Sequence, residues 1–225
     1  MSKFLQAVVW LGIVLSSTAV YSQNAPVLDG SGPKKVLVLG DSLSAAYKLP
    51  AERGWVYLLQ QRLRDQGAAT QVVNASVSGA TTAAGLQILP GALATHSPDV
   101  VLIELGANDG LQGKPVPYIR KNLQQLITLA QATGAKVVLL GVRLPPNFGA
   151  RYTEPFFAQY AALAVQNNLT LVPFILKGVA GQSGLMMEDG LHPNAEGQLH
   201  VLENVWAELA PILLSAGSEA QKLGN

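Results

Sequence analysis

Five short runs of hydrophobic residues, each followed by a polar or glycine-containing segment, divide most of the chain. They cover residues 35–39, 71–73, 99–105, 136–140 and 169–174. Continuous hydrophobic runs of this length are typical of strands that are buried on both faces. We therefore predict five strands of a buried, mostly parallel sheet.

Helical patterns separate these runs. Hydrophobic residues recur at helical spacing over 55–63, 119–130 and 199–209, and residues 155–167 also favour a helix. Asn194 is a plausible N-cap for the last helix. Strands that alternate with helices predict one domain over 35–212, with a three-layer α/β/α architecture and a five-stranded, mostly parallel, flavodoxin-like sheet.

The ends of the chain differ from this domain. Lys3 precedes an almost wholly apolar segment over 4–15, and small residues follow near Ser22. This order predicts a signal peptide over 1–22 and export to the periplasm or the medium. The alternative, a membrane anchor, needs about 20 apolar residues, more than this segment has, so we expect no stable anchor. We interpret 23–34 as a leader loop and 213–225 as a flexible tail.

Composition narrows the classes of function. The chain is 49% hydrophobic and only 13% charged, with a net charge of +1, which predicts a well-packed domain and no nucleic-acid partner. It contains no cysteine, which excludes disulfides, thiolate metal sites and a cysteine nucleophile. We expect a monomer.

Polar clusters follow the predicted strands or precede the last helix. They cover 40–44, 74–79, 106–109 and 189–193. In a parallel α/β sheet, ligands bind outside the carboxyl ends of the strands, at the point where the strand order reverses. We therefore expect the functional site where these clusters meet.

The residue types in these clusters predict nucleophilic catalysis. Ser42 needs a base to take its proton, and His192 is the candidate. Asp189, three residues earlier, can reach Nδ1 of that imidazole and fix its tautomer. An oxyanion needs hydrogen-bond donors, which we predict to be the Ser42 N–H, the Gly79 N–H and the Asn108 side-chain amide.

Taken together, these residues resemble the SGNH (GDSL) hydrolase family. Gly40-Asp-Ser-Leu43, Gly79, Asn108 within Gly-x-Asn-Asp, and Asp189-x-x-His192 match its four blocks in order. The match is closest to the bacterial acyl-CoA thioesterase, lysophospholipase and arylesterase branch. The resemblance implies an esterase or thioesterase that forms an acyl-enzyme on Ser42 and acts on a small acyl ester or thioester without metal or cofactor.

Three positions depart from that branch. Ala46 and Ala107 stand where glycine is common, and Ala80 stands where an acidic residue often follows the glycine of the second block. None of these changes removes a reacting group. The change at Ala80 makes the substrate preference harder to predict than the chemistry.

Other interpretations remain open. A metal-dependent phosphoesterase would use Asp41, Asp109, Asp189 and His192 as ligands, although no histidine pair has metal-ligand spacing. A binding module could hold a phosphate after the first strand, and a carbohydrate acetylesterase would share the same chemistry. We otherwise expect Asp41 to be structural and Asp109 to fix the Asn108 loop by local hydrogen bonds.

The remaining histidines and one loop have ordinary interpretations. We predict that His96 lies in a solvated loop and that His200 lies at the boundary of the last helix. The loop 145–149 is either a wall of the substrate groove or an ordinary surface loop.

Overall fold

The computed structural model describes residues 34–214. The predicted signal peptide, the leader loop up to residue 33 and the tail from residue 215 lie outside the described residues. Within 34–214, no helix combines the length and the apolar character needed to cross a bilayer.

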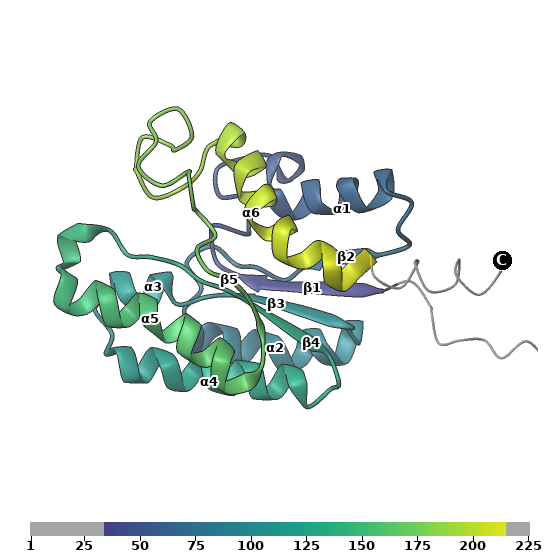
Figure 1. Cartoon of the computed structure of the whole chain (residues 1–225), viewed down its shortest axis with the longest axis horizontal. Coiled ribbons are helices and arrows are strands. Elements are labelled where there is room, and N and C mark those ends of the chain that lie inside the picture. The colour runs from purple at the N-terminus through teal and green to yellow at the C-terminus, as the bar shows by residue number, and fades with distance from the viewer. Residues whose placement is uncertain (1–33, 215–225) are drawn as a thin grey trace, which may run out of the picture. The chain divides into compact units, whose positions relative to one another are not determined.

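Five parallel strands form one sheet in the order β2-β1-β3-β4-β5 (Figure 1), which confirms the predicted fold class. Their side chains are most deeply buried in the central strands β1 and β3, as the continuous hydrophobic runs predict. The strands are β1 (Lys35–Gly40), β2 (Gln71–Asn74), β3 (Val100–Glu104), β4 (Lys136–Leu140) and β5 (Thr170–Val172).

Helices cover both faces of the sheet (Figure 1). One face carries α1 (Trp55–Asp65) and α6 (Ala195–Leu214), which pack on each other. The other carries α2 (Thr82–His96), α4 (Val116–Gln131) and α5 (Ala150–Asn167), with the short α3 (Ala107–Leu111) beside α4. Two 3-10 turns, Ala51–Arg53 and Pro146–Phe148, lie in loops.

Several helix boundaries differ from the prediction. α2 and α3 were not predicted at all, and His96 is the last residue of α2 rather than part of a loop. The Asn194 cap is confirmed, because its Oδ1 accepts hydrogen bonds from the backbone N–H groups of Glu196 and Gly197. α6 runs two residues beyond the expected domain end, and Leu213 is buried.

The strand order reverses between β1 and β3. β1 pairs with β2 on one side and with β3 on the other, so the connections leave in opposite directions. Ser42 follows β1, and Asn108 lies in α3 just after β3. Both therefore lie at the edge of the sheet where an α/β fold opens a binding crevice.

Candidate active site

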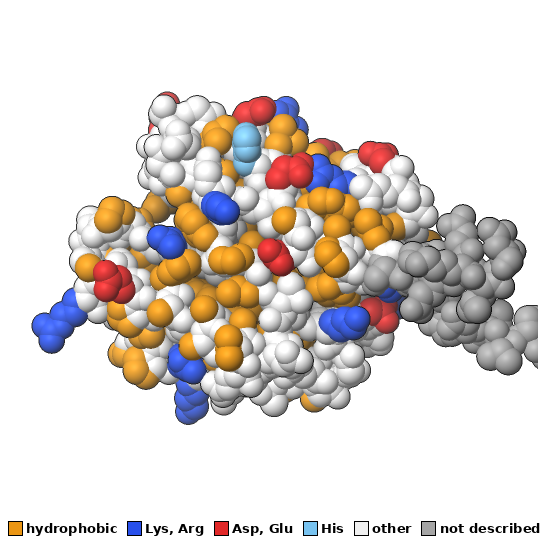
Figure 2. Space-filling model, in the orientation of Figure 1, with side chains coloured by type: hydrophobic (Ala, Val, Ile, Leu, Met, Phe, Trp, Pro, Cys, Tyr) orange, Lys and Arg blue, Asp and Glu red, His pale blue; other side chains and the backbone are white. Residues whose placement is uncertain are grey.

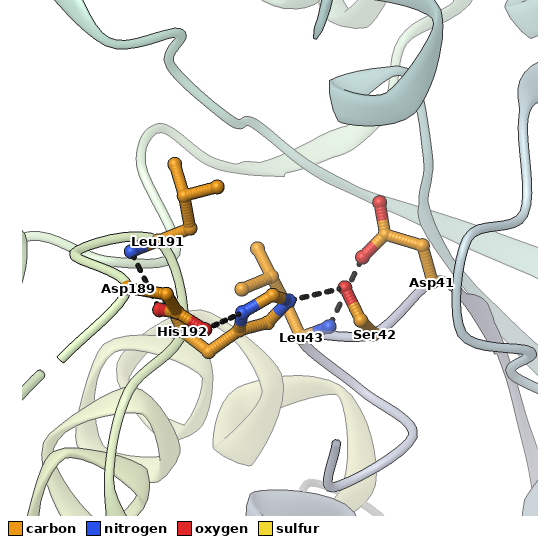
Figure 3. A network of polar contacts seen from close by, with 6 residues as sticks. All are labelled: Asp41, Ser42, Leu43, Asp189, Leu191 and His192. Atoms are coloured by element: carbon orange, nitrogen blue, oxygen red, sulfur yellow. Dashed lines mark hydrogen bonds and ion pairs between the residues drawn. The ribbon is translucent and has the colours of Figure 1, made fainter. Parts of the chain in front are cut away.

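Ser42, His192 and Asp189 form one hydrogen-bonded series (Figure 3). The imidazole Nε2 lies 2.8 Å from the Ser42 hydroxyl, although 150 residues separate the two in sequence. Its Nδ1 lies 2.9 Å from Oδ2 of Asp189. The structure thus brings together the three residues that sequence analysis selected as nucleophile, base and acid.

Asp189 determines which imidazole nitrogen carries the proton. Partial burial alone would raise its pKa, but hydrogen bonds from the Leu191 and His192 N–H groups and from the imidazole outweigh this and hold the pKa at about 2. An ionised carboxylate can only accept, so Nδ1 donates to Asp189. Nε2 is then free to accept the Ser42 proton, as a general base must.

A tight hydrogen-bonded turn presents the nucleophile. Residues 42–48 form a series of turns. The Ala45 N–H donates to the Asp41 carbonyl at 2.9 Å, and the Leu43 N–H donates to Oδ1 of Asp41 at 3.0 Å. Within residues 34–214 the Ser42 N–H has no hydrogen-bond acceptor, so it remains available beside its own hydroxyl.

Two small residues of this segment, Gly40 and Ala46, have different structural settings. A Cβ at Gly40 would lie 2.7 Å from the Ser44 hydroxyl and 2.8 Å from Oε2 of Glu104. Ala46 occupies the left-handed region, at φ 55°. That conformation favours glycine, the residue that the family resemblance led us to expect at this position.

The Gly79 loop is hydrogen-bonded to the same strand end. The Val77 N–H donates to the Gly40 carbonyl at 3.0 Å, and the Asn74 side chain donates to the Ser44 carbonyl at 2.9 Å. Gly79 has φ 80°, which glycine adopts without strain. Among the described residues its N–H also has no acceptor.

Asn108 is held by its side-chain nitrogen. Nδ2 donates to Oδ2 of Asp41 at 3.0 Å and to the Ala80 carbonyl at 3.1 Å. Both of its hydrogens are therefore engaged in this structure. An oxyanion at this position would have to replace or share one of these acceptors, as catalytic hydrogen bonds often form only in the complex.

Two carboxyl groups are buried beneath the site. Asp41 and Glu104 are 1% and 0% exposed, and Glu104 belongs to β3 beside the end of β1. Burial raises the pKa of Asp41 to about 6 and, with the nearby Asp41 charge, raises the pKa of Glu104 well above its usual range. Asp41 has a structural position, as expected, whereas sequence reasoning gave Glu104 no role.

Asp109 binds a distant segment rather than its own loop, contrary to the local bonds that were predicted. Its carboxylate accepts from the N–H and the hydroxyl of Thr82, both at 2.7 Å. Asn122 in α4 donates to the same hydroxyl at 3.0 Å. Asp109 therefore joins α3 to the first turn of α2, which fixes the segment that carries Asn108.

One aromatic contact was also missed. The ring of Tyr47 lies 4.4 Å from the imidazole of His192, centroid to centroid, with the planes tilted by 38°. The Tyr47 ring thus packs against the same imidazole that Asp189 orients by its hydrogen bond to Nδ1. A tyrosine five residues after Ser42 carries no sequence signal for this contact, because the contact depends on a loop 145 positions away.

An apolar cavity opens beside Ser42. Its volume is about 220 Å³, and Ser42, Asn108 and His192 line its polar end. A groove of about 500 Å³ shares much of its wall, including Leu144, Pro145 and other mainly apolar residues. Pro145 and Pro146 both line the groove, which supports the interpretation of 145–149 as a wall.

The surface near this groove is rich in hydrophobic side chains. On the face shown in Figure 2 they gather between α5 and α6, with single charged side chains scattered among them. Arg143 lines both the cavity and the groove, and its guanidinium lies 3.8 Å from the centroid of the Phe157 ring and 5.4 Å from that of Phe174. This part of the wall is therefore an aromatic cluster with one cation.

The alternative metal ligands do not converge. In the part of the chain that the structure describes, no three His, Asp or Glu side chains are grouped closely enough to hold a metal ion. Asp41 bonds to Asn108, Asp109 bonds to Thr82, and Asp189 bonds to His192. His200 is exposed on α6 and belongs to none of these networks.

Curated proteins include several close relatives. "Esterase TesA" of Pseudomonas aeruginosa is 52% identical over 178 residues, covering 79% of this chain and 89% of the relative. "Arylesterase" of Vibrio mimicus is 48% identical, covering 78% and 88%. "Thioesterase 1/protease 1/lysophospholipase L1" of Escherichia coli K12 is 39% identical, covering 79% and 84%.

The fold and the family agree with these relatives. A solved structure described as "Crystal Structure of TesA" has a TM-score of 0.78 and 51% identity, covering 80% of this chain and all of that one. Residues 38–199 match the GDSL-like Lipase/Acylhydrolase family. This chain therefore belongs to the GDSL-like lipase/acylhydrolase family and is a carboxylic ester hydrolase.

Proposed function

We propose that the enzyme cleaves carboxylic esters and thioesters through an acyl-enzyme on Ser42, with His192 as base and Asp189 as its partner. The single observation that carries this proposal is the continuous hydrogen-bonded series Ser42–His192–Asp189 at the polar end of an apolar cavity. A serine hydroxyl becomes an effective nucleophile only in such an arrangement.

The proposed reaction has two acyl-transfer steps. Ser42 Oγ attacks the carbonyl carbon while its proton moves to Nε2 of His192. The imidazolium then protonates the leaving alcohol or thiol, and the acyl group stays on Ser42. Water enters, loses a proton to Nε2 and attacks the acyl carbon. The imidazolium then returns that proton to Ser42 Oγ as the bond to the acyl carbon breaks, so that carboxylic acid leaves and the serine is restored. Asp189 remains ionised and stabilises the imidazolium in both steps.

Three donors would stabilise the oxyanion. The Ser42 and Gly79 N–H groups are candidates because neither has an acceptor among the described residues. Asn108 would add its side-chain amide by exchanging the Ala80 carbonyl, its longer and neutral acceptor, for the oxyanion. Its bond to Asp41 would then keep the amide oriented. Each such donor contributes about 10²–10³ in kcat.

The substrate class follows from the cavity lining. Apolar side chains dominate both the cavity and the groove, which suits a hydrocarbon acyl or aryl group with its ester carbonyl at Ser42. A carbohydrate acetylesterase would need polar groups around the sugar, and these walls offer few. The names of the relatives, esterase, arylesterase and thioesterase/lysophospholipase, support small acyl esters and thioesters.

We also propose that the enzyme is exported and acts as a monomer. The charged, apolar and small residues of 1–22 support export, to the periplasm or the medium. We propose a monomer that binds no nucleic acid and needs no cofactor, because the proposed chemistry uses only side chains and backbone groups of one chain.

Hydrolysis of a p-nitrophenyl ester series by the mature enzyme tests the mechanism. Ser42→Ala should lower kcat by about 10⁴ or more at unchanged thermal stability, because the nucleophile is lost. Ser183→Ala, an exposed serine on the same loop as Asp189, is the matched control and should keep full activity. A fully active Ser42→Ala enzyme, or complete loss of wild-type activity in chelator, would contradict the serine mechanism.

A further inference from the structure

Glu104 is a buried acidic residue that the proposed mechanism leaves without a role. Its Oε2 accepts a hydrogen bond from the Ser44 hydroxyl at 2.9 Å and from the Asp41 N–H at 3.2 Å. Its Oε1 is buried and, within residues 34–214, accepts no hydrogen bond. An ionised carboxylate with a dry, unpartnered oxygen is costly, so this oxygen is where a proton is expected.

The acceptor for such a proton is the neighbouring carboxylate of Asp41. The Asp41 N–H donates to Oε2 of Glu104 at 3.2 Å, so these two buried residues lie beside each other. The imidazole of His192 also acts on Asp41, and both carboxyl groups raise the pKa of the buried Tyr160 hydroxyl. No Lys or Arg forms an ion pair with either carboxyl group in the described part of the chain. Two adjacent buried carboxylates without a cation cannot both remain ionised.

The remaining contacts identify which of the two is ionised. Asp41 accepts from the Leu43 N–H and from the Asn108 side chain, each at 3.0 Å, and these donors favour its charged form. Glu104 has no donor at Oε1. The proton therefore belongs on Glu104.

We propose that Glu104 is a protonated positioning residue, which shares its carboxyl hydrogen with the Asp41 carboxylate and thereby fixes the acceptor that holds Asn108 beside Ser42. The chain of contacts runs from β3 through Glu104 and Asp41 to Asn108. Its catalytic consequence rests on the proposed function, because it assumes that Asn108 stabilises the oxyanion. The position of the proton does not depend on that assumption.

Infrared spectroscopy tests the proton directly. The spectrum of the wild-type enzyme in D₂O at neutral pH, minus that of Glu104→Gln, should contain the carbonyl band of a protonated carboxyl group. The glutamine keeps the shape, can donate to Asp41 and can accept from Ser44. A difference spectrum that contains only carboxylate bands would show that Glu104 is ionised and would overturn the proposal.

Kinetics test the link to Asn108. Glu104→Leu can neither donate nor accept, so kcat should fall by about 10–100-fold, part of the 10²–10³ that an oxyanion donor supplies, while KM changes less than about threefold. Glu104→Gln should restore kcat to within about threefold of the wild type. Binding of a phosphonate transition-state analogue should weaken in parallel with kcat.

A matched control separates positioning from loss of buried structure. Tyr160→Phe removes a different buried polar group near the end of β3, the Tyr160 hydroxyl, which donates to the Leu105 carbonyl at 2.9 Å. It should lower thermal stability and leave kcat unchanged.

A folded Glu104→Leu enzyme with wild-type kcat, or a Glu104→Gln enzyme as slow as Asn108→Ala, would overturn the positioning role. If Glu104→Leu does not fold, the glutamine variant and its infrared spectrum decide the matter. A fully active Ser42→Ala enzyme would instead refute the proposed function and leave the infrared result standing.

Discussion

Replacing Asp189 with asparagine should inactivate the enzyme more than replacing it with alanine. Oδ1 of Asp189 accepts two backbone N–H groups, from Leu191 and His192, both at 3.0 Å. The amide oxygen of the introduced asparagine must therefore stay on that side. Its NH₂ group then faces Nδ1, which has to become an acceptor, and the imidazole proton moves to Nε2. In that tautomer His192 donates to Ser42 and cannot take its proton.

The magnitude follows from the alternatives that remain. Turning the amide over would sacrifice two backbone hydrogen bonds, at about 1 kcal/mol each, and would set NH₂ against two donors. The variant also loses the negative charge that stabilises the imidazolium. We expect kcat to fall by about 10³–10⁴, or about 4–5.5 kcal/mol of transition-state stabilisation, with KM nearly unchanged. Asp189→Ala imposes no tautomer, so its kcat should fall about tenfold less.

Steady-state hydrolysis of p-nitrophenyl butyrate by both variants tests this order. Glu188→Gln, which removes an exposed carboxylate from the adjacent position, should keep full activity. Circular dichroism melting should show that all three variants are folded. An asparagine variant that is as active as the alanine variant, or that keeps a tenth of wild-type kcat, would refute the tautomer argument.

Two further predictions concern stability. Because burial raises the pKa of Asp41 from 3.8 to about 6, the folded enzyme holds a proton that the unfolded chain releases in this range, and this contribution to stability falls as the pH rises. Asp41→Asn removes this pH-dependent contribution. Denaturant unfolding at several pH values should therefore show that the free energy of unfolding of the variant rises relative to that of the wild type from pH 4 to 6. A difference in unfolding free energy that does not change with pH would contradict the pKa shift. Lys48 is exposed and has φ 55°, so Lys48→Gly should be about 0.5–1 kcal/mol more stable than Lys48→Ala, since the two differ only in a strained Cβ. Equal denaturation midpoints for the two variants would show that the strain is absent.

Hydrophobic periodicity predicted the helices that have one buried and one exposed face, but it did not predict α2. The segment Thr82–His96 contains mostly alanine, leucine and glycine, with Pro90 in its interior, so no polar stripe alternates with an apolar one. α2 packs against α4 and β1. Its own sequence has no distinct hydrophobic stripe that would indicate which residues make these contacts. α3 is five residues long, too short for any helical period to be visible.

The proposed triad could be predicted because two short motifs carry it, Gly40-Asp-Ser-Leu43 and Asp189-x-x-His192. The hydrogen bonds that hold the residues around Ser42 could not be predicted, because each joins two residues that are far apart in the sequence. Glu104 reads as the last residue of a buried strand, and only the register that places it opposite Gly40 puts it under Asp41. The partner of Asp109 is a threonine in a helix that went unpredicted. Asn108, which the sequence suggested as an oxyanion donor, lines the same cavity as Ser42, but its two bonds to Asp41 and Ala80 were not predicted.

Asp189 and His192 lie in a single turn, which is closed by the hydrogen bond from the Met187 N–H to the His192 carbonyl at 2.8 Å. The acid and the base are therefore assembled by local bonds, independently of the sheet. Residues 173–194 around them contain no helix or strand, only the isolated bridge between Met186 and Pro193. The contact between His192 and Ser42 thus depends on how this loop packs against the Ser42 turn. We therefore expect substitutions in this loop to change the temperature of half-maximal activity more than they change the melting temperature of the core.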